Sequence, residues 1–188
     1  MKIHAEYTLY GHFFFLRQLL GGVERLRFFM DQDSGMRAAH LAAFQPEIKA
    51  RTANALYVRV TKELSVSQKR ACLTVSRARF EAAKQAHPGL SDAGMQMLLI
   101  KAAIAQMATL GKWQDRWLVH PFPDMSEPKK AVCYLTEFGD YTADHLARLY
   151  QKASLHGIDR FFMQVRRQLS LLERPIGTAS KARRMWYG

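Results

Sequence analysis

Two aspartates close the most apolar short segment in the first part of the chain. The sequence RLRFFMDQDSG, residues 25–35, runs through three apolar residues into Asp31 and Asp33. A carboxylate at the C-terminal end of a strand is held by a rigid element and faces the edge where α/β proteins bind ligands. Because Mg²⁺ and similar ions take oxygen ligands, both aspartates are candidate metal ligands. The alternative is an Asx-type turn in which Gly35 adopts a positive φ.

Glu173 is the second acid of interest, in the segment FFMQVRRQLSLLERPI. On a helix it would share a face with Arg166 and Leu169. A glutamate on a helix can complete a metal site that begins at Asp31. The alternative is a surface carboxylate that pairs with Arg166 or Arg174. Since the helix macrodipole disfavours a carboxylate near a C-terminus, Glu173 is expected to have some compensating partner.

The charge balance favours a polyanionic partner. Lys and Arg number 28 against 16 Asp and Glu, which gives a net charge of +12. Neutralising phosphates releases condensed counterions, so such a balance is typical of nucleic-acid-binding proteins. Candidate phosphate ligands gather in the last quarter of the chain, near Trp186 and Tyr187: Arg160, Arg166, Arg167, Arg174, Lys181, Arg183 and Arg184. The alternative for this cluster is a solvated helix face followed by a frayed tail.

Other classes of protein fit the sequence less well. Cys72 and Cys133 lie far apart and outside any zinc-ligand spacing, so neither a zinc site nor a disulfide framework is expected. The N-terminus is too polar for a signal peptide. The longest apolar run is interrupted by Lys101, which favours a buried helix over a membrane span. We therefore expect a cytoplasmic protein with no membrane partner.

The elements that would position these residues form a helix-rich α/β pattern. Strands are predicted near residues 3–9, 25–31 and 55–60, where aromatic and β-branched residues gather. Helices are predicted at residues 11–22, 35–44, 65–87, 91–111, 142–156 and 158–173. The helix at 65–87 is long and basic, and the one at 91–111 is apolar nearly all round. The early strand–helix alternation predicts at least partly parallel strands.

Two segments resemble a known family. YTLYGHFFFLRQLLGGVERLRFFMDQDSGMRAA resembles the stretch of insertion-sequence transposases that leads to their second catalytic aspartate, which a glycine follows four residues later. Those positions here are Asp31 and Gly35. DRFFMQVRRQLSLLERPI resembles the late helix of the family, which carries the catalytic glutamate, here Glu173.

The resemblance implies an RNase H-like fold and DNA cleavage and strand transfer in transposition. An Asp-Asp-Glu set in that family binds two Mg²⁺ or Mn²⁺ ions, so Asp31 and Glu173 would be catalytic metal ligands. Arg166, Arg167 and Arg174 would lie near the phosphates of duplex DNA at the transposon ends. Residues 1–61 and 157–188 would form the catalytic core, and residues 62–156 a mainly helical insertion. Such a protein would work at the bacterial nucleoid, with a homo-oligomer as one option.

The sequence departs from this family in two places. The first aspartate of the family lies on a strand upstream of residues 3–9, and this chain lacks it. Pro175 would end the glutamate helix at once, and the closing RRMWYG looks cut short. We therefore expect an incomplete RNase H-like core, a fragment of a transposase catalytic domain that is inactive alone.

Two further hypotheses come from other classes. The first is a non-enzymatic helical protein that binds nucleic acid or has a regulatory role, through the basic helix at 65–87 and the C-terminal cations. The second is a protein-interaction module whose interface includes the aromatic residues at 13–15 and at 113–117.

Overall fold

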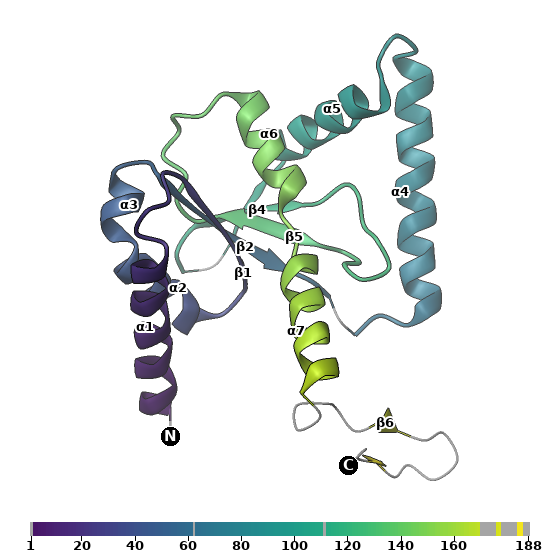
Figure 1. Ribbon diagram of the computed structural model, residues 1–188. Helices are drawn as coiled ribbons and strands as arrows, with labels where there is room; N and C mark the ends of the chain where they lie inside the picture. The colour runs from purple at the N-terminus through teal and green to yellow at the C-terminus, as the bar shows by residue number, and fades with distance from the viewer. Residues whose placement is uncertain (1, 62, 111, 170–175, 178–183, 186–188) are drawn as a thin grey trace. The chain divides into compact units, whose positions relative to one another are not determined.

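The computed structural model describes residues 2–61, 63–110, 112–169, 176–177 and 184–185 (Figure 1). The chain forms two compact units, residues 1–154 and residues 155–188. Within the described residues, no helix combines the length and the apolar character that crossing a membrane requires.

A mixed five-stranded sheet forms the centre of the first unit. Its strands are β1 (Leu26–Asp31), β2 (Ala53–Arg59), β5 (Ala131–Tyr134), β4 (Asp115–Val119) and β3 (Ala108–Leu110), in the order β1-β2-β5-β4-β3. β1 and β2 are parallel, and every other neighbouring pair is antiparallel. The predicted helix-rich α/β class is confirmed, as are the strands expected near 25–31 and 55–60.

The strand expected at residues 3–9 is wrong, because α1 (Lys2–Leu19) is helical from its start. The alternation in IHAEYTL suggested a strand. The side chains of Phe13, Leu16 and Leu20, however, pack against the core at helical spacing, and Leu9 continues that spacing towards the N-terminus. Leu9 also packs closely on Gly35, where an added Cβ would lie 3.0 Å from Leu9 Cδ1. The helical period therefore overrides the local alternation.

Two short helices connect the parallel strands: α2 (Ser34–Ala43) and α3 (Gln45–Lys49), which has a proline in its first turn. α1 and α2 pack together and cover one face of the sheet, where Phe28 meets the rings of His40 and Phe44. The opposite face is buried too, since Leu56 and Val132 are fully covered. Figure 1 shows α6 crossing in front of the sheet.

Residues 62–156 contain three strands of the sheet as well as helices. The helices are α4 (Val66–Ala86), α5 (Asp92–Ala105) and α6 (Ala143–Lys152). Ser91 caps α5 as its sequence suggests, accepting the N–H of Gly94. The helix expected at 91–111 ends early, at Ala105, because residues 108–110 pair with β4 as β3. The division into a core and an insertion stays a prediction.

The second unit consists of α7 (His156–Gln168) and a short antiparallel pair, β6 (Ile176–Gly177) with β7 (Arg184–Met185). The helix expected at 158–173 thus begins two residues earlier and ends earlier, at Gln168, because Leu169 is its C-cap and has an extended backbone. One side of α7 is apolar, with Phe161, Phe162 and Val165, and Arg160 and Arg167 lie on the other.

Candidate functional site

Asp31 lies where the sequence predicts, at the C-terminal end of a parallel strand. It is the last residue of β1, it is exposed, and its Oδ1 accepts the N–H of Gln32 at 2.9 Å. Among the described residues, Asp31 belongs to no group of three acidic, histidine or cysteine side chains close enough to share a metal ion. Of the two expected metal ligands, Asp31 and Glu173, the described part of the chain therefore contains only Asp31.

Asp33 serves the turn and the helix that follows. It is the N-cap of α2, and its Oδ1 accepts the N–H of Met36 at 3.0 Å. Its carbonyl oxygen accepts the hydroxyl of Tyr57 from β2. Gly35 lies in the first turn of α2 and does not take the positive φ that an isolated turn would need. Asp33 is thus a capping residue whose carboxylate is already bonded.

The other predicted residues lie partly outside the described part of the chain. Glu173, Arg174, Lys181 and Arg183 fall there, and Arg184 is described only as part of β7. Arg160 and Arg167 are exposed on α7, seven residues apart and so on one face of the helix. Arg166 is half-buried, with its guanidinium carbon 6.0 Å from the centre of the Phe162 ring.

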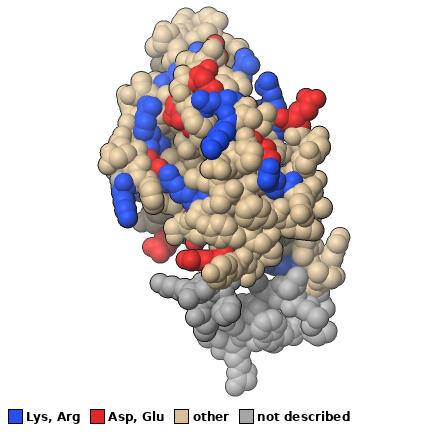
Figure 2. Space-filling model, turned by 90° about the vertical axis from the view of Figure 1, so that its left-hand side faces the viewer, with Lys and Arg blue, Asp and Glu red and all other residues tan. Residues whose placement is uncertain are grey.

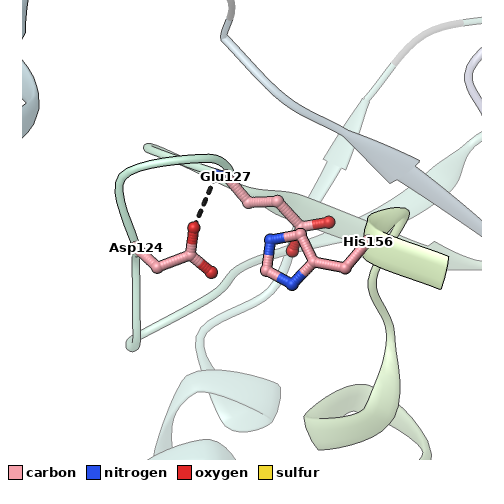
Figure 3. A group of neighbouring side chains, drawn as sticks. All are labelled: Asp124, Glu127 and His156. Atoms are coloured by element: carbon pink, nitrogen blue, oxygen red, sulfur yellow. Dashed lines mark hydrogen bonds between the residues drawn. The ribbon is translucent and has the colours of Figure 1, made fainter. Parts of the chain in front are cut away.

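A different trio of side chains has the composition of a metal site. The ligand types of Asp124, Glu127 and His156, two carboxylates and an imidazole, would not select Mg²⁺ over other divalent ions (Figure 3). Asp124 and Glu127 precede β5, whereas His156 opens α7 and belongs to the second unit. Within the first unit, the metal hypothesis therefore rests on the two carboxylates.

Both carboxylates already have partners in the fold. Asp124 Oδ1 accepts the backbone N–H groups of Ser126 and Glu127, each at 2.7 Å. Glu127 is buried and accepts Lys130 Nζ at 2.8 Å and the hydroxyl of Ser154 at 2.9 Å. A cation bound by Glu127 would compete with the ammonium of Lys130. The pair is therefore better explained as a structural network that fixes the loop before β5.

A groove lies between α4, α5 and β4. Its volume is about 860 Å³, and its walls are mainly apolar, with Val75, Leu99 and Trp117 among them. Arg79 and Lys129 add two cations to the lining. The size is that of a ligand pocket. The rest of the lining is apolar or neutral and polar, and the described residues add no carboxylate to it.

His120 also lines this groove and does not supply a charge at neutral pH. Burial, and then the nearby ammonium of Lys130, lower the pKa of His120 to about 4. Its Nδ1 accepts the N–H of Phe122 at 3.2 Å. The imidazole is therefore a neutral structural group in the wall of the groove.

α4 carries a basic surface that its sequence already suggested. No residue of this 21-residue helix is buried. Arg70 and Arg77 are exposed and seven residues apart, so they lie on one side of the helix, which we call the α4 basic face. Glu81 is the one acid in the helix. By contrast, Figure 2 shows Lys and Arg mixed with Asp and Glu over the side of the molecule that it presents.

Several buried polar residues were not predicted from the sequence. Glu127 and Lys130 lie three residues apart in a loop, and Ser154 joins them from a position 27 residues beyond Glu127. Arg37 bonds Asp115 at 2.7 Å across 78 residues. The contacts of Ser154 with Glu127 and of Arg37 with Asp115 have no short-range pattern, because the fold brings distant segments together. Glu127 and Lys130 are close in the sequence, but nothing in the sequence marks them as buried.

Comparison of the chain with protein-family models, with curated proteins and with solved structures finds no match.

Proposed function

We propose that this chain is a DNA-binding domain related to the catalytic cores of insertion-sequence transposases, with an RNase H-like ancestry. The observation that carries the DNA-binding part is the α4 basic face, on a helix with no buried residue in a chain of net charge +12. A long helix that makes few internal contacts and presents arginines suits the phosphate backbone of duplex DNA. The exposed Arg160 and Arg167 of α7 offer a second set of phosphate ligands.

The transposase part of the proposal is supported by the local order of elements. The chain runs from β1 to Asp31, then through α2 and α3 to a parallel β2. In the family that the sequence resembles, an apolar strand likewise ends at the second catalytic aspartate, and a glycine follows four residues later, as Gly35 does here. Mg²⁺ or Mn²⁺ binding at Asp31 remains part of the proposal, and its second ligand would be Glu173, which lies outside the described residues. Such a domain would act on transposon ends in the bacterial cytoplasm, at the nucleoid.

A non-enzymatic DNA-binding or regulatory role is the second candidate. It is favoured by the position of Asp31, which has no cluster of further metal-ligand side chains among the described residues. The two candidates share the DNA surface and differ in the metal. One experiment therefore tests the surface, and a second separates the candidates.

The surface is tested by fluorescence anisotropy with duplex DNA at several salt concentrations. We expect the double variant Arg70→Ala/Arg77→Ala to bind more weakly and to lower the slope of log affinity against log salt by about 2, since each lost phosphate contact removes about 0.9. The matched control is Arg17→Ala/Lys101→Ala, which removes two cations that lie outside α4 and are already paired with Glu47 and Asp144. Equal losses for both double variants would contradict the proposed surface.

The metal is tested by repeating the titration with and without Mg²⁺. A Mg²⁺ dependence of DNA binding that Asp31→Asn abolishes would support the transposase candidate. DNA affinity that changes neither with Mg²⁺ nor with Asp31→Asn would support the non-enzymatic candidate.

A further inference from the structure

β1 is an edge strand of the sheet formed by the described residues. It is the first strand in the sheet order, and no other described strand pairs with it beyond β2. The N–H of Leu26 donates to the carbonyl of Thr52 at 2.8 Å, on the β2 side. Because successive residues of a strand direct their backbone groups to opposite sides, the groups of Arg27, Phe29 and Asp31 point to the open edge.

Natural edge strands are usually kept from pairing with other chains by prolines, bulges, charged side chains or a covering helix or loop, or by being very short. β1 spans six residues, LRFFMD, without proline, and its pairing with β2 runs without a break in register. Its two charged residues, Arg27 and Asp31, have opposite signs, so they repel a strand of like charge but can complement a second copy of β1. Such an edge is a template for strand addition.

We propose that a second copy of this chain pairs with β1 in antiparallel orientation, about a two-fold axis at Phe29. The pairing is argued without the proposed function, but both use the carboxylate of Asp31, so the dimer described here is that of the chain without metal or DNA. In this register Arg27 lies opposite Asp31 of the second copy, and Phe29 lies opposite its own equivalent. All three are residues whose backbone groups face the open edge, so the pairing forms about six N–H···O bonds.

Charge selects this partner and this register. Arg27 and Asp31 lie on the same face of β1, since they are four residues apart, and both are exposed. The antiparallel register centred on Phe29 brings each arginine opposite an aspartate, twice over because of the symmetry. Opposite charges directly across an antiparallel pair stabilise it, and like charges destabilise it. The strand is thus complementary to itself.

The experiment is sedimentation velocity of the full chain over a range of concentrations, without DNA. We expect a reversible dimer. Arg27→Asp and Asp31→Arg should each raise the dimer dissociation constant about tenfold or more, because like charges then face each other. An equimolar mixture of the two variants should form a heterodimer, since both carboxylates of one chain then face the two guanidinium groups of the other. The double variant Arg27→Asp/Asp31→Arg should dimerise again.

Arg70→Asp is the matched control, because it makes the same charge change on α4 and should leave the dimer intact. Circular dichroism establishes that each variant is folded.

Arg27→Pro gives an independent check, since it removes an outward N–H without touching the β2 pairing, and it should abolish the dimer. A chain that stays monomeric at all concentrations would overturn the proposal, as would a dimer unaffected by these substitutions. A monomer that still binds DNA would overturn the dimer alone, and a charge-sensitive dimer that does not bind DNA would overturn the proposed function alone.

Discussion

His40 and Glu127 are both buried polar residues, but the fold accommodates them in opposite ways. His40 is 0% exposed, and its ring lies among Phe13, Phe28 and Phe44 with neither nitrogen bonded to another described residue. Glu127 is 2% exposed and has an ammonium and a hydroxyl as partners.

The difference follows from whether each side chain is buried in a neutral or in a charged form. An imidazole can be buried as a neutral ring, and burial lowers the pKa of His40 to about 4. A carboxylate buried without partners costs far more, so Glu127 comes with Lys130 and Ser154. The stability that depends on His40 should therefore respond mainly to pH. The stability that depends on Glu127 should respond mainly to the loss of Lys130 or Ser154.

The largest effect is expected from Lys130→Met. It leaves the Glu127 carboxylate buried without its cation, so the free energy of unfolding should fall by about 3–5 kcal/mol. Urea unfolding measures this change. Lys129→Met is the matched control, since Lys129 is exposed beside Lys130, and it should change stability by less than about 0.5 kcal/mol. The double variant Glu127→Leu/Lys130→Met should lose less than Lys130→Met, and an equal or greater loss would count against a buried charge pair.

The next largest effect is a pH dependence from His40. Its pKa is about 6.5 unfolded and about 4 folded, so the unfolded chain binds more protons between these values. The stability that His40 contributes is present above pH 6.5 and is lost as the pH falls towards 4, by about 3 kcal/mol in all.

Urea unfolding at several pH values measures this loss. His120 has a similarly lowered pKa and adds a loss in the same direction. His40→Leu should therefore remove about half of the slope below pH 6.5. A slope that survives His40→Leu in full would mean that His40 is not the buried neutral group described.

A smaller effect is expected from Ser154→Ala. This change removes the Ser154 hydroxyl that donates to Glu127 and keeps the ammonium of Lys130. Loss of a hydrogen bond to a buried carboxylate should lower the free energy of unfolding by about 1–3 kcal/mol. If the network acts as a unit, the effect of Ser154→Ala should shrink when Glu127 is already replaced by Leu. Simple additivity in that double-mutant cycle would argue against coupling.

The smallest effect is expected at Asp33, an exposed polar residue that bonds only locally through its side chain. Asp33→Ala removes the N-cap of α2 and should cost about 1 kcal/mol in urea unfolding, whereas Asp33→Asn keeps an acceptor and should cost a few tenths. A large loss with Asp33→Asn would show that the charge of Asp33 matters beyond capping.

Sequence reasoning succeeds here where the deciding contacts are local. The strand at 26–31 and the turn role of Asp33 both follow from neighbouring residues. It fails where a long-range partner decides. Residues 108–110 extend an apolar helical pattern but pair with β4 instead.

The candidate site divides in the same way. The position of Asp31 at a strand end could be predicted, because the apolar run before it marks the strand. The buried set of Glu127, Lys130 and Ser154 could not, because its members come from a loop and from the end of α6. The sequence does not distinguish His40 from the other histidines. Its burial follows from the fold, which packs the rings of Phe13 and Phe28 against it.

The antiparallel pairing of β2 with β5 has a consequence for how the chain is made. Ala55 donates its N–H to the hydroxyl of Thr136, 81 residues later. A ribosome adds about 5–20 residues per second, so β5 emerges about 4 to 16 seconds after β2. During that interval β1, α2, α3 and β2 can already assemble, because their contacts are local. The inner edge of β2 is then open to chaperones and to other nascent chains until β5 arrives to cover it.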